Sequence, residues 1–278
     1  MFARALTIMV FVALAGCATT TPTPPQEKAL QAPKEEKVEM SGGFSPVLQI
    51  PVTDAGTKSV MGALFEPEGT GPFPAVILLS GCAGWESKTE AGIATRVNAD
   101  YLPNRIAVLV LDSFRPRGVK NICGSNEAMM QAYDYRAEDA YAAMSWLAER
   151  PEIDKNHIFL QGYSHGAGSA ITAIGPKADS HKQKFAGVIA FFPYCFGPEK
   201  FSVPTIILIG EKDDWTPANR CQILHSKNLE VVVYPNATHD FVAPGLNTTY
   251  RGHRLVYQEE ATNDAQRRAL ALIESLSK

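Results

Sequence analysis

The sequence has no excess of charge of either sign, no long hydrophobic run and no internal repeat at a fixed period. Its 26 Lys and Arg residues and 29 Asp and Glu residues give a formal net charge of −3. This near-neutral charge gives no electrostatic reason to expect a nucleic acid as partner. The apolar run at residues 6–15 is too short to span a bilayer as a stable anchor. A hydrophobic content of 45% and a charged content of 20% over 278 residues are typical of one ordinary globular domain, or at most two small ones.

The first residues are not expected to belong to that domain. Arg4 precedes the apolar run, and residues 14–17 read Leu-Ala-Gly-Cys, which resembles the lipobox of bacterial lipoproteins. The resemblance implies a signal peptide at residues 1–16 and a diacylated Cys17 that becomes the N-terminus after cleavage. In that family Ala18, in place of aspartate, favours sorting to the outer membrane. A plain secretory signal with a coincidental cysteine is the alternative.

A tether is expected between the lipid anchor and the folded domain. Residues 17–41 begin with Cys17 and continue with mostly Thr, Pro, Lys and Glu and few large apolar side chains. Such a segment cannot bury enough apolar surface to fold, so we expect it to be flexible. The folded domain is then expected at residues 42–278, held at the membrane of the bacterial cell envelope by acyl chains.

Cysteine is scarce, and its spacing does not favour a metal site. The chain has five cysteines and no C-x-x-C pair, and no histidine stands at a spacing typical of zinc. Without Cys17 an even number remains, which in an oxidising compartment predicts disulfides. Each of the four follows a predicted strand, and of the three possible pairings we favour Cys82–Cys123 and Cys195–Cys221.

Short apolar runs alternate with helical patterns along the domain. Residues 47–52 and 59–65 predict an antiparallel pair of strands at a sheet edge. Four further runs predict buried strands at residues 75–79, 106–111, 188–192 and 205–209. Residues 230–234 predict the last strand, and another strand ends near residue 160. Helices are expected at residues 91–102, 127–149 and 261–276, and directly after residue 164. The alternation predicts an α/β domain with a doubly wound, mainly parallel sheet and helices on both faces.

The stretch Gly162-Tyr163-Ser164-His165-Gly166 has the G-x-S-x-G pattern between an apolar run and a segment of small residues. In strand–turn–helix context this pattern is a nucleophile elbow. The turn is so tight that only glycine fits two residues before and two residues after the serine. Ser164 is therefore the predicted nucleophile, and the start of the following helix faces the place where an oxyanion would form.

A base and an acid follow in the chain order of α/β-hydrolases. Asp213 comes after the predicted strand 205–209, and His239 comes after the strand 230–234. Because the carboxyl ends of parallel strands meet at one edge of a sheet, both side chains can reach Ser164. His239 is the predicted general base and Asp213 the acid that orients it. The nearby carboxylates of Glu211, Asp214 and Asp240 remain alternatives for the acid, although solvent is the usual environment of such groups.

The glycine-containing loop after the first buried strand is expected to complete the site. In α/β-hydrolases this loop supplies one oxyanion N–H, which we assign to Cys82, and His165 supplies the second. Three aromatic residues, Trp85, Trp215 and Phe241, are candidates for the walls of a substrate pocket, with core packing as the equal alternative. Asp112, Arg115 and Arg117 could bind an anionic substrate, but a structural Arg–Asp pair is preferred.

Together these stretches resemble the dienelactone hydrolase family of α/β-hydrolases. The matching segments are residues 80–84, 112–118, 162–166, 210–217 and 237–241, and the resemblance covers about residues 75–275. Two features depart from the family pattern, since its best-known members have a cysteine nucleophile where this chain has Ser164, and their oxyanion loop opens with His-Gly where this chain has Ser80 and Gly81.

The resemblance implies an α/β-hydrolase fold, and no long insertion in the sequence looks like a large lid, which predicts a fairly open site. The expected activity is hydrolysis of a small-molecule ester or lactone through an acyl-enzyme on Ser164, with no metal or organic cofactor. Acyl transfer or peptide cleavage by the same triad is an alternative, and so is a catalytically idle scaffold of the envelope.

Overall fold

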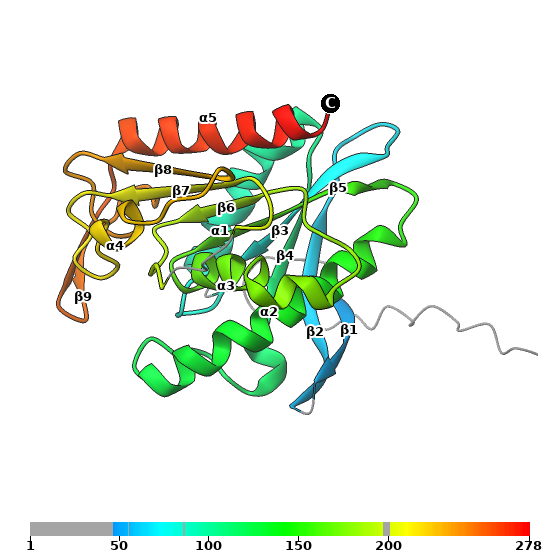
Figure 1. Cartoon of the computed structure of the whole chain (residues 1–278), viewed down its shortest axis with the longest axis horizontal. Coiled ribbons are helices and arrows are strands. Elements are labelled where there is room, and N and C mark those ends of the chain that lie inside the picture. The colour runs from blue at the N-terminus through cyan, green and yellow to red at the C-terminus, as the bar shows by residue number, and fades with distance from the viewer. Residues whose placement is uncertain (1–46, 55, 86, 197–200) are drawn as a thin grey trace, which may run out of the picture. The chain divides into compact units, whose positions relative to one another are not determined.

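A computed structural model describes residues 47–54, 56–85, 87–196 and 201–278. Eight strands form one sheet in the order β1-β2-β4-β3-β5-β6-β7-β8, and a separate hairpin pairs β9 with β10 (Figure 1). The strands are β1 (Leu48–Asp54), β2 (Thr57–Phe65), β3 (Phe73–Leu79), β4 (Ala107–Asp112), β5 (Ile153–Tyr163), β6 (Val188–Phe191), β7 (Thr205–Gly210), β8 (Leu229–Tyr234), β9 (Asn247–Tyr250) and β10 (His253–Val256).

Helices lie on both sides of the large sheet, with α5 on one side and α2 and α3 on the other (Figure 1). The α-helices are α1 (Ser87–Arg96), α2 (Asn126–Ala148), α3 (His165–Ala173), α4 (Asn219–Gln222) and α5 (Glu259–Leu276). Shorter helical turns are η1 (Val97–Tyr101), η2 (Leu102–Asn104), η3 (Arg115–Arg117) and η4 (Pro176–Ser180). The predicted doubly wound α/β architecture is confirmed.

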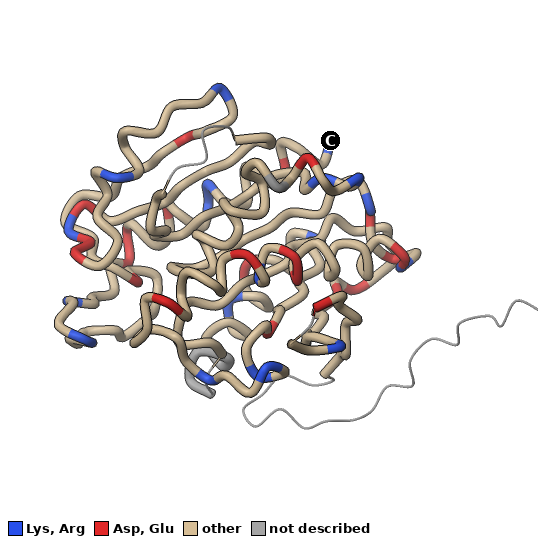
Figure 2. The backbone as a smooth tube through the Cα atoms, turned by 60° about the horizontal axis from the view of Figure 1, so that its bottom comes forward, with Lys and Arg blue, Asp and Glu red and all other residues tan. Residues whose placement is uncertain are grey.

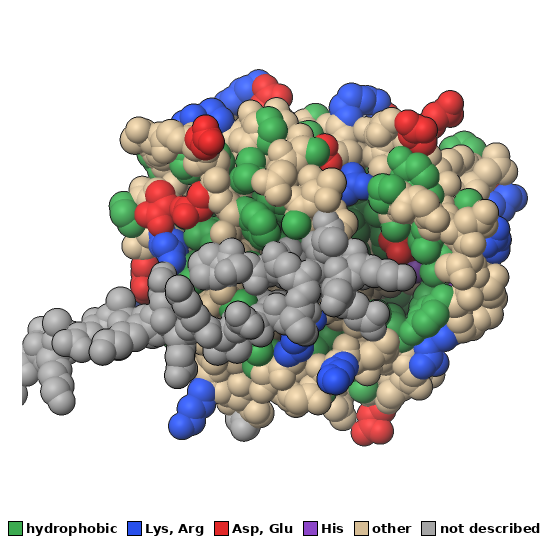
Figure 3. Space-filling model, turned by 180° about the vertical axis from the view of Figure 1, so that it is seen from behind, with side chains coloured by type: hydrophobic (Ala, Val, Ile, Leu, Met, Phe, Trp, Pro, Cys, Tyr) green, Lys and Arg blue, Asp and Glu red, His purple; other side chains and the backbone are tan. Residues whose placement is uncertain are grey.

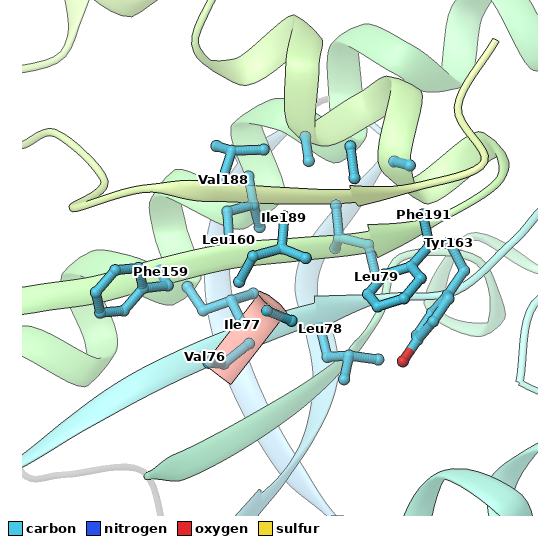
Figure 4. Close-up of a cluster of buried hydrophobic side chains, with 14 of the residues drawn as sticks. Val76, Ile77, Leu78, Leu79, Phe159, Leu160, Tyr163, Val188, Ile189 and Phe191 are labelled. Atoms are coloured by element: carbon cyan, nitrogen blue, oxygen red, sulfur yellow. The ribbon is translucent and has the colours of Figure 1, made fainter. Parts of the chain in front are cut away.

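The direction of the strands agrees with the sequence pattern. β1 pairs antiparallel with β2, and β2 pairs antiparallel with β4, whereas all pairs from β4 through β3 to β8 are parallel. β3, β4, β6 and β7 are almost wholly apolar because they are buried on both faces. Figure 4 shows this core, where side chains of β3, β5 and β6 pack together, among them Ile77, Leu160 and Ile189.

The topology brings β3 and β5 side by side although the chain visits β4 between them. Leu79 at the end of β3 is in register with Gly162 near the end of β5. The loop that leaves β3 and the turn that leaves β5 therefore start from neighbouring points on the same edge of the sheet. In open α/β sheets this change of winding direction is the usual place for a ligand.

The hairpin of β9 and β10 is an element that the sequence did not predict. All four residues of β9 are exposed, so no apolar alternation marks it as a strand. Its turn consists of Arg251 and Gly252, both with positive φ (51° and 90°), in place of the Asn-Gly or Asp-Gly that usually indicates such a hairpin. The predicted helix at 91–102 is also different, because α1 ends at Arg96 and the chain continues as a π-turn and a 3-10 turn.

Charged side chains are spread over the domain without a large patch of one sign. Basic and acidic residues are scattered along the backbone in Figure 2, and both kinds lie around the face in Figure 3. Within the described ranges no helix is both long and apolar enough to cross a membrane. The predicted signal peptide, Cys17 and the tether at 17–41 lie outside the described residues.

Candidate active site

Ser164 lies in the turn between β5 and α3, at the carboxyl end of the sheet. Its backbone has a φ of 51° and a ψ of −115°, a conformation that is rare for residues other than glycine. Strained backbone of this kind collects at functional sites, because a tight turn exposes one side chain at a fixed point. Ser164 is partly exposed, whereas its neighbours Tyr163 and His165 are buried.

The two glycines of the motif are required by close backbone contacts. A Cβ at Gly162 would stand 2.2 Å from the carbonyl of Gly166, and a Cβ at Gly166 would stand 2.3 Å from the carbonyl oxygen of Ser80. Neither contact can be relieved, since the opposing atoms belong to the backbone. The expectation that only glycine fits at both positions is therefore confirmed.

A continuous chain of hydrogen bonds leads from Ser164 to Asp213. The Ser164 Oγ lies 3.0 Å from His239 Nε2, and His239 Nδ1 lies 2.8 Å from Asp213 Oδ2. With Nδ1–H donating to the carboxylate, Nε2 is left to accept the serine proton. His239 and Asp213 are both buried, at 3% and 4% exposure, so water does not compete for this contact.

Asp213 is held by donors from its own loop. Its Oδ1 accepts hydrogen bonds from the backbone N–H of Trp215 (3.0 Å) and of Thr216 (2.7 Å). The Thr216 hydroxyl lies 2.8 Å from Asp213 Oδ2 and 3.1 Å from the carbonyl oxygen of Phe192. Thr216, which the sequence analysis did not single out, thus helps to fix the orientation of the carboxylate.

The other candidate acids point to different partners. Glu211 is exposed and accepts a hydrogen bond from the backbone N–H of Asn236. Asp214 is half exposed and lies 3.1 Å from Nδ1 of His253. Asp240 follows His239 in a left-handed backbone conformation (φ 55°), and burial raises the pKa of its carboxyl to about 6. The hydrogen bond to His239 distinguishes Asp213 from all three.

The loop after β3 lies against the elbow. A Cβ at Gly81 would stand 3.7 Å from Cβ of Ser164, and the carbonyl of Ser80 faces Gly166. Among the residues that the structure describes, the backbone N–H groups of Cys82 and His165 donate to no other protein group. The two predicted oxyanion donors therefore belong to two segments that flank Ser164, and both N–H groups are available.

Both predicted disulfides are present. Cys82 is bonded to Cys123, and Cys195 is bonded to Cys221. The first bond ties the loop after β3 to the segment that precedes α2. The second ties the segment after β6 to α4, on the side of the sheet edge that carries Asp213.

Two of the three residues proposed for a pocket wall belong to the core instead. Trp85 is 3% exposed and its Nε1–H donates to the carbonyl of Leu111. Phe241 is fully buried against Phe192. The sequence cannot show this, because an aromatic residue after a strand can turn inward or outward.

Trp215 keeps its place beside the site. Its ring centroid lies 5.1 Å from that of His239, and the ring stacks on His253 at 4.7 Å. Tyr250, from the hairpin that the sequence did not predict, lies 5.7 Å from the same ring. The hairpin thus contributes to the rim next to the histidine.

The arginines after β4 have structural contacts, as preferred from the sequence. Arg117 pairs with Asp139 at 2.8 Å and with Asp54, and its guanidinium lies over the ring of Tyr135. Arg115 pairs with Asp112 at 3.3 Å. These contacts hold η3 against the sheet and leave no reason to place an anionic substrate there.

Arg136 on α2 is a buried charged residue that the sequence analysis missed. Its guanidinium reaches the side chain of His165 and the backbone of Ser80. A signal was available, since Arg136 falls on the buried face of α2 with Tyr133, Ala137 and Ala140, where a charge is unusual. In the described part of the chain no group of three or more His, Cys, Asp or Glu side chains could hold a metal ion.

Comparisons with known proteins identify the family and agree with the fold. The profile of the dienelactone hydrolase family matches residues 60–277. A solved structure of a putative dienelactone hydrolase from Klebsiella pneumoniae subsp. pneumoniae is similar, with 18% identity and a TM-score of 0.63 over 82% of this chain and 98% of that chain. A dienelactone hydrolase-like promiscuous phosphotriesterase from metagenomic libraries has 18% identity and a TM-score of 0.66 over 83% of this chain and 98% of that chain.

An esterase has a similar fold as well. The Thermogutta terrifontis esterase 2, in a structure phosphorylated by paraoxon, shares 17% identity and a TM-score of 0.57 over 83% of this chain and 93% of that chain. A search of curated proteins found no match. At identities of 17–18% the solved structures show only a common fold. The family profile matches most of the sequence and therefore shows the family. The chain therefore belongs to the dienelactone hydrolase family.

Proposed function

We propose that the protein is a serine hydrolase that cleaves a carboxylic ester or a lactone. The observation that carries the proposal is the hydrogen-bonded chain Ser164–His239–Asp213 at the carboxyl edge of a parallel sheet. The family and the esterases of similar fold support a hydrolase that acts on small ester substrates.

In the proposed mechanism Ser164 attacks the carbonyl carbon of the substrate while His239 Nε2 takes the proton of the hydroxyl. The imidazolium that forms lies 2.8 Å from Asp213, which stabilises the charge and keeps the ring oriented. His239 then gives the proton to the leaving oxygen. A water molecule, activated by His239, attacks the acyl-enzyme and releases the acid and Ser164.

The carbonyl oxygen becomes negatively charged when the tetrahedral intermediate forms. The backbone N–H groups of Cys82 and His165 are the proposed donors to this oxyanion, because they flank Ser164 and have no other protein acceptor among the described residues. Removal of one such donor typically lowers the rate of an enzyme by about 10²–10³-fold.

A test begins with the purified full chain and p-nitrophenyl esters from acetate to laurate. We expect hydrolysis biased to short acyl chains, and we expect Ser164→Ala to lower kcat by about 10⁶-fold, to the level of residual catalysis. A fluorophosphonate probe should label wild type and fail to label Ser164→Ala. Absence of both hydrolysis and labelling would favour an idle scaffold. Labelling with transfer of the acyl group to an added alcohol, or cleavage of peptides only, would favour the acyltransferase or peptidase alternative.

We also propose that the domain is tethered to the bacterial envelope by acyl groups on Cys17. The support is the lipobox-like sequence at residues 14–17. Cys17→Ala should move the protein from the membrane fraction to the soluble periplasmic fraction and abolish incorporation of labelled palmitate. A variant that stays in the membrane fraction would contradict the lipid anchor.

A further inference from the structure

Arg136 is among the most deeply buried side chains of the molecule. It is 1% exposed, and its guanidinium lies over the ring of Phe114 at 4.7 Å. Burial lowers the pKa of Arg136 to about 10, so the group is still positively charged at neutral pH. A charge in such a place is unfavourable unless it has partners, and so its partners identify what it does.

The partners of Arg136 are all neutral. One terminal nitrogen lies 2.8 Å from His165 Nδ1, and the other lies 2.7 Å from the carbonyl oxygen of Ser80 and 3.3 Å from its hydroxyl. Its Nε–H is buried and has no hydrogen-bond partner among the described residues. No carboxylate of the described chain lies within ion-pair distance.

Two carboxylates, those of Asp139 and Asp112, raise the pKa of Arg136 by Coulombic attraction at longer range, but each forms its ion pair with another arginine. Asp139 pairs with Arg117, and Asp112 pairs with Arg115. Arg136 is therefore a buried cation that forms no ion pair with any described residue, although two carboxylates attract it at longer range.

The contacts of Arg136 fix the protonation of His165. An arginine can only donate, so His165 Nδ1 must accept and carry no proton. Nε2 then carries the proton and donates to the carbonyl of Met129 at 2.8 Å. Burial and the neighbouring arginine lower the pKa of His165 to about 3, which keeps the ring neutral, and Tyr133 stacks on it at 4.1 Å. The ring is therefore fixed on both edges and on one face.

These contacts join the two segments that flank Ser164. His165 begins α3 and Ser80 begins the loop after β3, and the two are 85 positions apart in the sequence. The backbone N–H of His165 and that of Cys82, two residues beyond Ser80, are the proposed oxyanion donors. Arg136 contacts both segments from behind, on the side away from solvent.

We propose that Arg136 is a positioning residue for the oxyanion hole, a buried cation that sets the spacing of the two donor segments. The negative charge that complements it would then be the oxyanion of the tetrahedral intermediate. This inference rests on the proposed function, because it assumes an oxyanion at Ser164. A buried arginine with a purely structural role would more often have a carboxylate partner, as Arg117 does.

The experiment compares Arg136→Met and Arg136→Lys with wild type in the full chain. Lysine keeps the charge but cannot bridge two segments with a planar fork. The fraction of competent sites is first counted with the fluorophosphonate probe at long reaction times, so that unfolded protein does not enter the rates. We expect kcat per competent site to fall by about 10²-fold in Arg136→Met and by about tenfold in Arg136→Lys, with KM changed less than threefold.

A trifluoromethyl ketone separates positioning from loss of structure. With Ser164 it forms a tetrahedral adduct that carries an oxyanion, so its inhibition constant should rise by the same factor by which kcat/KM falls. The matched control is Arg117→Met, which removes another arginine with a largely buried side chain. It should lower the melting temperature but leave kcat/KM and the inhibition constant within threefold of wild type.

Arg136 variants whose kcat and ketone affinity both stay within threefold of wild type would overturn the inference and leave the proposed function intact. If Arg136→Met does not fold, Arg136→Lys is tested alone. A tenfold loss of kcat in that variant would support the inference, and a kcat and a ketone affinity within threefold of wild type would overturn it. A wild-type protein that neither hydrolyses esters nor reacts with the probe would overturn the proposed function itself, and the inference with it.

Discussion

The acid side and the oxyanion side of Ser164 each contain a buried charge, and the two are stabilised differently. On the acid side, Asp213 accepts hydrogen bonds from two backbone N–H groups, from the hydroxyl of Thr216 and from His239. On the oxyanion side, Arg136 donates to His165 and Ser80, which are neutral. The carboxylate thus contacts a group that becomes a cation during the proposed reaction, whereas the guanidinium contacts no ionised group among the described residues.

The difference shows how each side is prepared for a charge that exists only transiently. His239 is positioned to gain a proton beside an anion that is already in place. If Arg136 positions the oxyanion hole, the oxyanion forms beside two segments, the loop after β3 and the start of α3, that are both in contact with this cation. Arrangements made before the reaction are effective because no reorganisation is needed when charge develops. The two sides can be altered separately, and their responses are expected to differ.

The largest effect is expected on the acid side. Asp213→Asn should lower kcat by about 10⁴-fold, because the amide can donate to His239 Nδ1 and leave the proton on Nε2, where it blocks acceptance from Ser164. The matched variant Asp214→Asn alters the adjacent carboxylate, which is 53% exposed, and should change kcat less than threefold. Steady-state kinetics with a short p-nitrophenyl ester measures both. Equal losses in the two variants would contradict the assignment of the acid.

Effects of intermediate size are expected when the two disulfides are removed one at a time. They close loops with sequence separations of 41 and 26 residues, so removal of either is expected to cost about 3–4 kcal/mol of the free energy of unfolding. Cys82→Ala with Cys123→Ala should also lower kcat by about tenfold, because this disulfide holds the loop whose backbone N–H at position 82 is a proposed oxyanion donor. Cys195→Ala with Cys221→Ala should change kcat less than threefold.

Urea denaturation and kinetics below the unfolding transition separate the two effects of each disulfide. A loss of kcat that is the same in both double variants would show that the loop after β3 has no special role. Loss of stability without any loss of kcat in the Cys82 and Cys123 variant would contradict the placement of the oxyanion hole.

The smallest expected effect is on stability, at Asp240 beside the catalytic histidine of the proposed mechanism. Burial raises the pKa of its carboxyl to about 6, so the folded state holds this proton more tightly than the unfolded state does. The ionised form is therefore penalised above pH 6, and the penalty disappears as the pH falls through the unfolded value near 4. Asparagine also tolerates the left-handed backbone at this position (φ 55°).

Asp240→Asn should consequently raise the free energy of unfolding by about 1–2 kcal/mol at pH 8, less than the full shift would give because Asp240 is partly exposed. The gain should shrink to zero near pH 4. Thermal unfolding of wild type and variant across this range measures the difference. A gain that does not depend on pH would point to the backbone conformation rather than to the charge.

The sequence by itself determined the features that depend on local geometry and on chain order. The glycines around Ser164 are required because a Cβ at either position would stand 2.2–2.3 Å from backbone atoms, and such a requirement is visible in five consecutive letters. Buried strands are continuous apolar runs, so their positions and their alternation with helices predicted the sheet. Since parallel strands end at one edge, the order of Ser164, Asp213 and His239 was enough to predict that they meet.

Only the tertiary structure decided which distant side chains are in contact in the core. Arg136 reaches Ser80 across 56 positions and His165 across 29, and the packing of α2 against α3 and the loop after β3 brings these residues together. The same kind of packing turned Trp85 and Phe241 inward and left Trp215 beside His239. The pairing of β9 with β10 likewise depends on a turn that adopts positive φ without the usual residues. The periodicity of apolar residues along a chain predicts which face of a helix or strand is buried. Which side chains that face then contacts follows from how the helices and strands pack together.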